Sequence, residues 1–325
     1  MANYLVTGIA GFIGSSLAHE LVKRGHSVRG IDNLITGNLE NLADIRDRID
    51  FRHADLLDLD AMHGACRDID YVLHQAAIPS VPRSVKDPIE SNRANVDGTV
   101  NILVAARDAK VKRMTYASSS SLYGESPSLP KHEGMLPDPI SPYAVSKLTG
   151  EYYMRSFYRV YGLETVSIRY FNVFGPRQDP SSMYSGVLAI FITKMLKGEQ
   201  PTIHGDGEQS RDFTFIDNVI SGNLLACEAP ADQVAGKYFN VATGTRVTLN
   251  YTYSVLQKLI GYSKSPLYGP DRAGDIKHSL ADVALAQKHL GYRALVNFED
   301  GLSRTVDWYR RAFPTLAAAT SRTQG

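Results

Sequence analysis

Short apolar segments alternate with longer amphipathic segments through the first half of the chain. Short apolar runs predict strands, and apolar residues that recur with the period of a helix predict helices. The strands are expected at 3–7, 27–31, 50–53, 70–74, 112–117 and 164–169. The helices are expected at 12–24, 88–109 and 142–160. This alternation is typical of an α/β fold, so we expect a doubly wound parallel sheet with helices on both faces.

The pattern loosens after residue 170, where loops rich in Gly and Pro separate shorter helices. These helices are expected at 184–197, 216–229, 248–260, 281–290 and 299–312. We therefore expect two domains. Residues 1–170 would hold the sheet, with a later segment near 213–242 returning to it, and residues 171–325 would form a smaller substrate-binding lobe. The Ala-, Thr- and Ser-rich tail after Pro314 is expected to be disordered.

Positive and negative side chains are nearly balanced, with 35 Lys and Arg, 34 Asp and Glu, and a net charge of +1. Without a dense basic run there is no electrostatic case for binding nucleic acid or an anionic membrane. Cys66 and Cys227 lack the spacing of a metal site and are expected to be buried. No segment approaches the roughly 20 apolar residues of a membrane span, and the N-terminus does not resemble a signal peptide. We therefore expect a cytoplasmic enzyme without a metal.

Three glycines, Gly8, Gly11 and Gly14, join the first strand to the first helix. They allow a tight turn, the approach of backbone N–H groups to a diphosphate, and close packing of helix on strand. The diphosphate would also meet the positive end of the helix dipole. The second strand ends at Asp32, which is expected to bind the adenosine ribose hydroxyls and to repel a 2′-phosphate. Asn33 follows instead of an arginine, so the sequence predicts a Rossmann-type site for NAD and not for NADP.

A second group of residues carries candidate chemistry. The strand at 112–117 leads into the run Ser118 to Ser121, at a strand end where open α/β folds bind ligands. Tyr143 and Lys147 are four residues apart and share one face of a helix. A free phenol has a pKa of about 10, so it needs nearby positive charge, here from Lys147, to act as a base at neutral pH. With a serine hydroxyl to hold a substrate oxygen, this set predicts hydride transfer from the carbon that bears that oxygen.

Further motifs follow in order along the chain: Thr7-Gly-x-x-Gly-Phe-Ile-Gly14, Asp32-Asn33, Asp55-Leu56, His74-Gln-Ala-Ala77, Asn95-x-x-Gly98-Thr99, Ser118 to Gly124, Ser141-Pro-Tyr-Ala-x-Ser-Lys147, Arg169-Tyr-Phe-Asn-Val-Phe-Gly-Pro176, Gly205-Asp-Gly-x-Gln-x-Arg-Asp-Phe213 and Arg272-Ala-Gly-Asp275. As an ordered set they resemble the extended short-chain dehydrogenases/reductases, and among them the nucleotide-sugar 4-epimerases. The resemblance covers nearly the whole chain. The run from His74 to Ser84 also resembles the subgroup of N-acetylhexosamine 4-epimerases.

This resemblance implies a set of residues that contact NAD. Asp55 and Leu56 would flank the adenine, Ala76 and Asn95 would line the cofactor channel, and Tyr170 would pack beside the nicotinamide. The whole implied set is Gly8, Gly11, Phe12, Ile13, Gly14, Asp32, Asn33, Gly37, Asp55, Leu56, Gln75, Ala76, Ala77, Asn95, Ser118, Tyr143, Lys147 and Tyr170.

The resemblance also implies catalytic and substrate-binding residues. The catalytic set is Ser119, Tyr143 and Lys147, although the run of serines leaves the choice of serine open by one place. Asn172, Arg211, Arg272 and Asp275 would hold the nucleotide diphosphate and its ribose, and Arg83 would contact a uronate. The whole substrate set is Ser80, Arg83, Ser119, Ser120, Tyr143, Asn172, Arg211, Arg272, Asp275 and Ser279. A homodimer that pairs helices 88–109 and 142–160 is expected by resemblance.

The expected reaction depends on residues that the chain lacks. Members of the family that dehydrate carry an Asp-Glu pair in the serine segment, and decarboxylases usually carry a glutamate, where this chain has Ser120 and Ser121. The resemblance therefore implies reversible epimerisation at C4 of a UDP-hexose, with NAD as a bound catalyst. A tyrosine at the position of Ser279 would exclude an N-acetyl group. The small serine predicts UDP-GlcNAc and UDP-GalNAc as the preferred pair, with UDP-Glc, UDP-Gal and the uronic acids as further substrates.

Three other functions stay open. A UDP-glucuronate decarboxylase or 4-epimerase would share the fold. A plain NAD-dependent dehydrogenase would exchange its cofactor with solvent. A catalytically silent NAD-binding regulator would keep the glycines and lose the catalytic residues, whereas this chain retains Tyr143, Lys147 and a serine.

Overall fold

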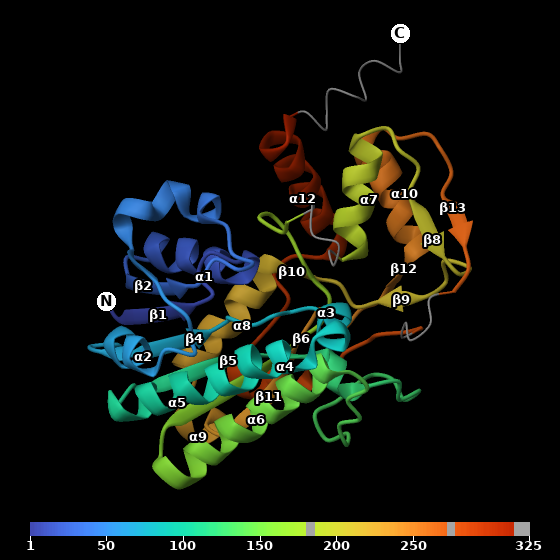
Figure 1. Cartoon of the computed structure of the whole chain (residues 1–325). Coiled ribbons are helices and arrows are strands. Elements are labelled where there is room, and N and C mark those ends of the chain that lie inside the picture. The colour runs from blue at the N-terminus through green and yellow to red at the C-terminus, as the bar shows by residue number, and fades with distance from the viewer. Residues whose placement is uncertain (180–185, 272–276, 315–325) are drawn as a thin grey trace.

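The computed structural model describes residues 1–179, 186–271 and 277–314. Its centre is a seven-stranded sheet with the order β11-β6-β5-β4-β1-β2-β3, in which every neighbouring pair is parallel (Figure 1). The strands are β1 (Asn3–Thr7), β2 (Ser27–Asp32), β3 (Asp50–His53), β4 (Tyr71–His74), β5 (Arg113–Ser119), β6 (Glu164–Tyr170) and β11 (Lys237–Val241). The predicted α/β fold with a doubly wound parallel sheet is confirmed. The predictions for Arg272, Asp275 and the tail after Pro314 lie outside the described residues.

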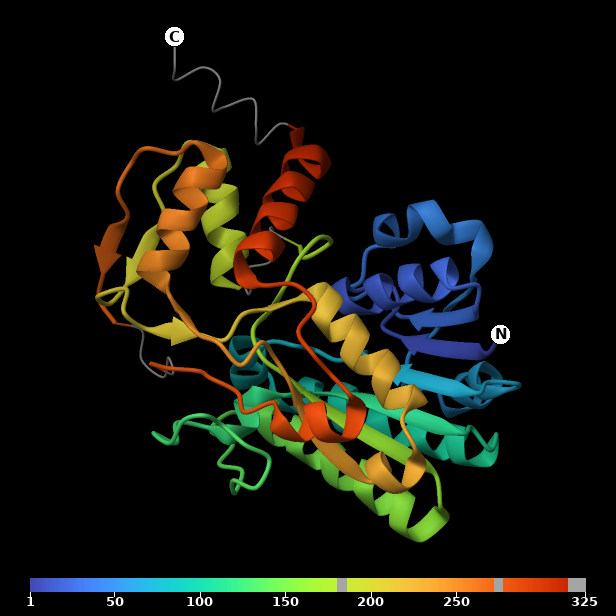
Figure 2. The same cartoon turned by 180° about the vertical axis from the view of Figure 1, so that it is seen from behind.

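Helices cover both faces of the sheet because successive side chains of each strand point to opposite faces. On one face Leu5 and Ile31 pack in a core with α2 (Leu59–Cys66), α5 (Gly98–Asp108) and α6 (Pro142–Tyr161). On the other face Tyr4 and Val6 pack in a core with α1 (Phe12–Lys23), the 3-10 helix η1 (Leu39–Arg48) and α8 (Ile216–Glu228). Figure 2 shows α8 lying across the sheet on this second face. Both cysteines are buried in these cores, as predicted.

Helix α6 begins and ends where its sequence predicts. The hydroxyl of Ser141 accepts a hydrogen bond from the N–H of Ala144, and Pro142 occupies the first turn, where its missing N–H costs nothing. The helix ends at Gly162, which has a left-handed φ of 75°. These caps place Tyr143 in the first turn of the helix, at the carboxyl end of the neighbouring strands.

Several elements differ from the predicted pattern. The single helix expected over 88–109 is three segments: α4 (Pro88–Asn92), a π-helical turn η2 (Arg93–Asp97) and α5. Helices α2 and η1, the short helix α3 (Val81–Lys86) and strand β11 were not expected as elements. Strand β11 carries Asn240, a polar residue that is fully buried, and this polar residue interrupts the apolar run that would have indicated a strand.

The remaining elements form a smaller part beside the sheet, seen at the upper right in Figure 1. Its helices are α7 (Val187–Leu196), α10 (Leu249–Ile260) and α12 (Phe298–Ala312). Short strands accompany them, namely β8 (Thr202–His204), β9 (Ser210–Arg211), β12 (Val247–Thr248) and β13 (Leu267–Gly269). Strands β7 (Val173–Phe174) and β10 (Thr214–Phe215) pair with each other, and β10 contacts both α8 and α12. The short helices α9 (Ala231–Val234) and α11 (Ala284–Leu290) instead contact the sheet, at β6 and β11 respectively. One continuous apolar core joins α7, α10 and α12 to β6 and β11.

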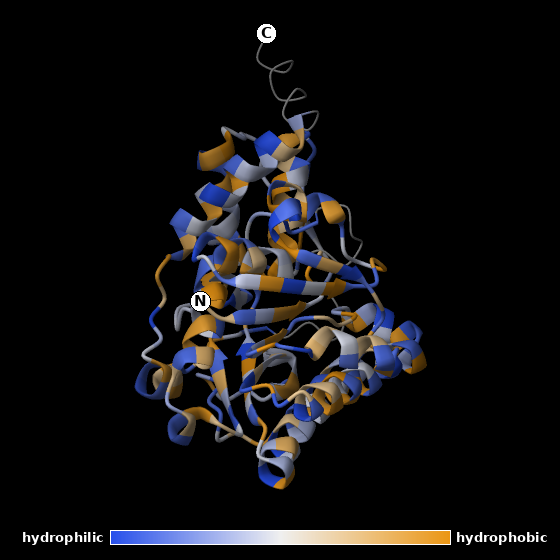
Figure 3. Ribbon diagram, turned by 90° about the vertical axis from the view of Figure 1, so that its left-hand side faces the viewer, coloured by the Kyte–Doolittle hydropathy of each residue, from blue (hydrophilic) through white to orange (hydrophobic). Residues whose placement is uncertain are grey.

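The outer helices have hydrophilic and hydrophobic stretches that alternate along the ribbon, as expected for helices with one face on a core (Figure 3). None of the helices within the described ranges combines the length and the apolar character needed to cross a membrane.

Candidate functional site

A cavity of about 2150 Å³ opens between the carboxyl edge of the sheet and the smaller part. Six of the sheet strands, all but β11, deliver residues to it at or just beyond their carboxyl ends. The predicted site residues that line it are Gly8, Gly11, Phe12, Ile13, Gly14, Asp32, Asn33, Gly37, Asp55, Leu56, Gln75, Ala76, Ala77, Ser80, Arg83, Ser118, Ser119, Ser120, Tyr143, Tyr170, Asn172, Arg211 and Ser279. Because parallel strands end at one edge, residues far apart in sequence meet here.

The turn between β1 and α1 is packed too tightly to admit side chains at two of its glycines. Gly8 has a φ of +67°, and a Cβ there would lie 2.8 Å from backbone atoms of Ala76. A Cβ on Gly14 would lie 2.1 Å from the carbonyl oxygen of Gly8. The first turn of α1 therefore sits directly on the strand end. This arrangement aims the N-terminus of the helix at the cavity and fits a diphosphate group there.

Acidic residues follow the turn along the wall. The carboxylate of Asp32 accepts hydrogen bonds from the N–H groups of Ala10 at 2.9 Å and Leu34 at 2.8 Å. Burial raises the pKa of this carboxyl group, and the two N–H donors oppose that rise. The side-chain amide of Asn33 donates to Asp55 at 2.8 Å. The two carboxylates on this wall would repel a 2′-phosphate on the adenosine ribose. The geometry therefore favours a cofactor whose adenosine ribose carries no phosphate.

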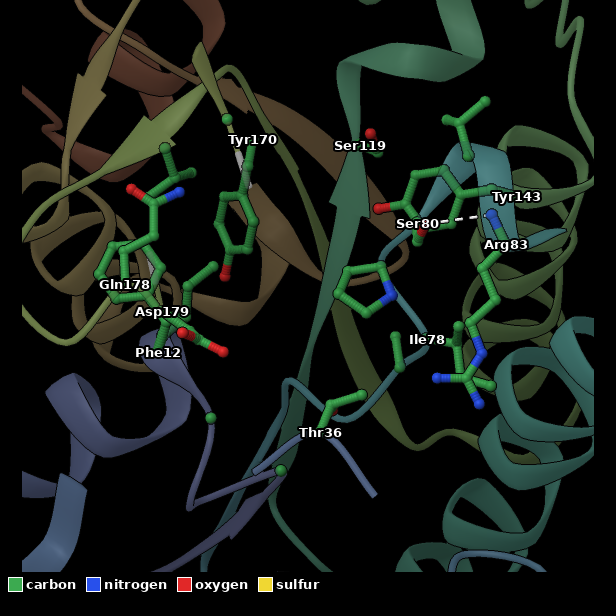
Figure 4. Close-up of a pocket in the computed structure, with 18 of the residues that line it drawn as sticks. Phe12, Thr36, Ile78, Ser80, Arg83, Ser119, Tyr143, Tyr170, Gln178 and Asp179 are labelled. Atoms are coloured by element: carbon green, nitrogen blue, oxygen red, sulfur yellow. Dashed lines mark hydrogen bonds between the residues drawn. The ribbon is translucent and has the colours of Figure 1, made fainter. Parts of the chain in front are cut away.

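Ser119, Tyr143 and Lys147 come together where β5 meets α6. Ser119 ends β5, and its hydrogen bond to Tyr143 lowers the pKa of the phenol. Lys147 lies one turn further along α6, with Nζ 6.0 Å from the centre of the Tyr143 ring and donating at 2.8 Å to the carbonyl oxygen of Ala117. Figure 4 shows Ser119 and Tyr143 on the opposite side of the cavity from Tyr170. The hydroxyl of Ser118 donates instead to Glu151, so Ser119 is the serine beside the phenol.

Burial acts on the acid–base groups in opposite directions. It raises the pKa of Tyr143, against the hydrogen bond from Ser119. It lowers the pKa of Lys147 from 10.5 to about 7. Both shifts favour the neutral form, because the charged form loses its solvation in the protein interior. A positive charge brought into the cavity by a ligand would favour the phenolate, which is the form that can accept a proton.

The opposite wall holds Tyr170 at the end of β6. Its hydroxyl donates to the side-chain oxygen of Gln75 at 3.0 Å and accepts from the amide of Asn223 at 2.8 Å. Burial raises the pKa of this phenol well above its ordinary value. Tyr170 therefore offers a fixed, neutral aromatic ring to the cavity. Asn223 of α8 was missed by the sequence analysis, because an asparagine within a helix gives no local signal of such a contact.

Two predicted residues lie behind the cavity wall. Asn95 is buried, and its side chain accepts from the N–H of Ile78 at 2.8 Å and donates to Ser146 at 3.1 Å. The expectation that Asn95 lines the channel is therefore corrected: it fastens the loop after β4 to helix α6. Lys147 is likewise buried and does not line the cavity; it lies next to Tyr143, whose side chain does.

Further predicted substrate residues also line the cavity. Arg83 forms a two-point ion pair with Glu90, at 2.6 Å and 3.1 Å, and Ser80 caps the same short helix α3. A uronate would need the positive charge of Arg83, and the negative charge of Glu90 offsets that charge. Asn172, with a φ of 36°, donates to the backbone of Asp212 and lies 3.5 Å from the hydroxyl of Ser279.

Arg211 donates to the carbonyl oxygen of Lys277 at 3.1 Å. Arg177 also lines the cavity and was missed, although it directly follows the motif that ends at Pro176; its guanidinium donates to Ser16 of α1 at 3.4 Å. Across residues 1–179, 186–271 and 277–314, no three His, Cys, Asp or Glu side chains are grouped so that they could hold a metal ion.

Comparison with known proteins adds independent information. The model of the NAD-dependent epimerase/dehydratase family matches residues 4–242. A UDP-glucose 4-epimerase of Mycolicibacterium smegmatis is 39% identical over 311 residues, which cover 94% of this chain and 98% of the relative. Among solved structures, a UDP-N-acetylglucosamine 4-epimerase from Methanobrevibacter ruminantium, in complex with UDP-N-acetylmuramic acid, is 38% identical to this chain. The two match with a TM-score of 0.92 over 96% of this chain and 99% of that one.

A third neighbour is the UDP-glucuronic acid 4-epimerase of Bacillus cereus in complex with UDP-glucuronic acid and NAD. It is 34% identical with a TM-score of 0.87, over 96% of this chain and 100% of that one. The similar proteins therefore share the fold and the whole length of the chain but differ in the sugar named for each.

The buried Lys147 leads to a prediction for Lys147→Met. The unfolded chain holds the lysine proton more tightly than the folded protein, so the buried lysine destabilises the fold fully below pH 7. That penalty falls as the pH rises from about 7 towards the ordinary lysine value of about 10.5. We expect Lys147→Met to melt several degrees above the wild type at pH 6 and the difference to shrink by pH 9, measured by thermal unfolding.

The control for this prediction is Lys258→Met, which removes an exposed lysine on α10. Its melting temperature is expected to follow the wild type at both pH values. A difference for Lys147→Met that stays constant from pH 6 to pH 9 would contradict the prediction.

Proposed function

Because this chain belongs to the NAD-dependent epimerase/dehydratase family, we propose that it interconverts UDP-sugars that differ in configuration at C4. The observation that carries the proposal is the convergence of two groups of residues on one cavity. The glycine turn and Asp32 form a dinucleotide site at one end, and Ser119, Tyr143 and Lys147 form an acid–base set beside it. This is the set that oxidation of a secondary alcohol requires.

NAD is the cofactor of this family, and the residues present fit it. The turn at Gly8 and Gly14 leaves no space for side chains and presents a helix N-terminus, as a diphosphate requires. Asp32 would hold the adenosine ribose, Asp55 and Leu56 the adenine, and Tyr170 the nicotinamide. When bound, NAD+ supplies an acceptor for hydride from C4 and returns that hydride to the opposite face of the sugar.

The residues of the chain would move the proton that accompanies this exchange. Ser119 would hold the 4-hydroxyl of the sugar, and the phenolate of Tyr143 would take its proton as C4 becomes a carbonyl carbon. After the 4-keto sugar has turned over in the cavity, Tyr143 would return the proton to the carbonyl oxygen. Lys147, when charged, would stabilise the phenolate between these steps. Contacts to the UDP group would keep the intermediate bound while the sugar rotates.

The absence of carboxylates beside the serines favours epimerisation over the related reactions. Ser120 and Ser121 stand where dehydration or decarboxylation would call for an acidic residue, and both line the cavity. A decarboxylase of UDP-N-acetylglucosaminuronate from Bacillus cytotoxicus is 32% identical to this chain, so decarboxylation is the second candidate.

Among UDP-sugars we infer a preference for UDP-GlcNAc and UDP-GalNAc. The supporting observation is Ser279, a small residue that lines the cavity beside Asn172 and leaves room for a bulky group at C2 of the sugar. The neighbour from Methanobrevibacter ruminantium, which acts on UDP-N-acetylglucosamine, is consistent with this reading. The relatives named for UDP-glucose and UDP-glucuronate keep those sugars as further candidates.

We also propose that the chain forms a homodimer through α5 and α6. Val145, Tyr152 and Val160 recur along one side of α6 and are 48%, 57% and 66% exposed. Leu103 of α5 and Phe157 of α6 do not extend this exposed face, because both side chains belong to the core of the sheet. A row of exposed apolar side chains on a long helix is typical of a helix-to-helix interface.

The proposed reaction is tested on purified protein without added NAD. UDP-GlcNAc, UDP-Glc and UDP-glucuronate are incubated separately, and the products are resolved by anion-exchange chromatography and NMR. We expect UDP-GalNAc from UDP-GlcNAc, with the other sugars converted more slowly. Tyr143→Phe serves as control and should retain NAD but lose at least about 100-fold in turnover, because general base catalysis contributes that much.

A pentose product and release of carbon dioxide from UDP-glucuronate would favour the decarboxylase. No conversion of any of the three sugars, even after NAD has been supplied, would contradict the proposed reaction.

The C2 pocket is tested by Ser279→Tyr, with Ser279→Ala as the matched small variant. The tyrosine should reduce kcat/KM for UDP-GlcNAc by about 100-fold or more and spare UDP-Glc, because a bulky side chain would occupy the space of the N-acetyl group. The alanine should leave both activities in place. Equal losses for both sugars with the tyrosine would contradict the role of this residue.

The dimer is tested by light scattering during size-exclusion chromatography. We expect a dimer for the wild type and a monomer for the double variant Tyr152→Glu and Val160→Glu, because the interface would have to bury the new charges. Leu295→Glu places a charge at another exposed apolar residue and should leave the dimer intact. A monomeric wild type would refute the interface.

A further inference from the structure

Three consecutive residues at the end of β5 each interact with a different residue of α6. The carbonyl oxygen of Ala117 accepts from Lys147 at 2.8 Å. The hydroxyl of Ser118 donates to Glu151 at 2.6 Å. Ser119 lies beside Tyr143, and its hydroxyl lowers the pKa of that phenol. The last three residues of the strand are thus fixed against two turns of the helix.

The middle bond is part of a buried ion pair. Arg169 of β6 donates to both carboxylate oxygens of Glu151, at 2.9 Å and 2.7 Å. The two side chains are 1% and 2% exposed. The third nitrogen of the guanidinium donates to Tyr123 at 2.8 Å, and Arg169 stacks 4.1 Å from the centre of the Tyr238 ring. Arg169 therefore holds the Glu151 carboxylate at both oxygens, and this carboxylate accepts the hydrogen bond from the Ser118 hydroxyl.

Burial of this ion pair costs free energy, so its stability contribution alone does not explain its presence. Taking two charges out of water costs several kcal/mol for each ion, and apolar residues of the same size often stabilise a core as well or better. The pair lies behind the strand end that carries Ser119. Because Ser119 directly follows Ser118 in the strand, holding Ser118 against Glu151 also restricts the position of the Ser119 hydroxyl.

We propose that Glu151 and Arg169 are positioning residues: through Ser118 they hold the end of β5 so that the hydroxyl of Ser119 meets Tyr143. The inference rests on the proposed function for the roles of Ser119 and Tyr143. Neither Glu151 nor Arg169 lines the cavity, so neither touches a ligand. Their contribution is geometric, and a displacement of about 1 Å in such a set can cost about 100-fold in rate.

The fold supplies a matched control at the other end of the same two strands. Arg113 begins β5 and Glu164 begins β6, and their side chains form an ion pair at 2.6 Å and 2.8 Å. Arg113 is 2% exposed and Glu164 is 25% exposed. Glu164→Gln therefore weakens a pair of the same chemistry that has no contact with the catalytic residues. An effect seen with Glu151→Gln but not with Glu164→Gln is therefore caused by the location of the Glu151–Arg169 pair and not by the loss of a buried ion pair as such.

The first experiment compares Glu151→Gln, Ser118→Ala and Glu164→Gln as holoenzymes. We expect Glu151→Gln and Ser118→Ala each to lower kcat about tenfold or more with little change in KM, since they displace the reacting groups and not the bound nucleotide. The double variant should lose no more than Glu151→Gln alone, because both changes break one connection. Glu164→Gln should keep the wild-type kcat, even if the substitution lowers the melting temperature.

A second measurement needs no substrate. The ultraviolet absorbance of tyrosinate is titrated with pH in each holoenzyme, and the signal of Tyr143 is identified by its loss in Tyr143→Phe. Tyr143 titrates beside Lys147 of its own helix and Tyr116 of β5, and none of the variants changes either residue. Loss of the hydrogen bond from Ser119 should raise the pKa of Tyr143 in Glu151→Gln. Removing a negative charge without moving Ser119 would lower it instead.

The two measurements separate the inference from the proposed function. If the wild type converts no UDP-sugar but Glu151→Gln raises the pKa of Tyr143, the reaction is wrong and the positioning role stands. If the wild type is active and Glu151→Gln matches Glu164→Gln in both kcat and titration, the pair is structural and the inference is overturned. A lower pKa of Tyr143 in Glu151→Gln would also overturn it.

Discussion

The attachment of helix α6 to the end of strand β5 is the contact on which the site depends. One side of the junction carries Tyr143 and Lys147, and the other carries Ser119. The parallel sheet sets the position of the strand end, and the cap at Ser141 sets the first turn of the helix. Neither the phenol nor the hydroxyl could be placed by a flexible loop to within the length of a hydrogen bond.

Burial has different consequences for the two cations at this junction. Lys147 loses solvation without a carboxylate partner, so its pKa falls to about 7. Burial also disfavours the charge of Arg169, but the hydrogen bonds and charge of Glu151 outweigh that effect and its pKa rises. One cation can therefore respond to a charge that enters the cavity, whereas the other stays fixed. A lysine is suited to the first task and an arginine to the second.

Local patterns in the sequence predicted the sheet, the glycine turn and the Tyr143–Lys147 pair, because each depends on residues close together in the chain. The features that sequence reasoning missed depend on contacts between distant residues. Asn223 meets Tyr170, and Arg169 meets Glu151, only after the sheet has formed. Asn95 is the converse case, since the resemblance put it in the cavity wall and tertiary packing puts it behind that wall. Local pattern carries no information about such pairings.

The last strand of the sheet has a consequence for the synthesis of the protein. Strand β11 pairs with β6, but α7 and the strands β8 to β10 lie between them in the chain. When β6 has left the ribosome, its outer edge therefore has no partner until residue 241 has also been made. An open strand edge is a site for pairing with other chains. The nascent N-terminal half thus exposes an unpaired, aggregation-prone edge until the segment that follows α8 arrives to close it.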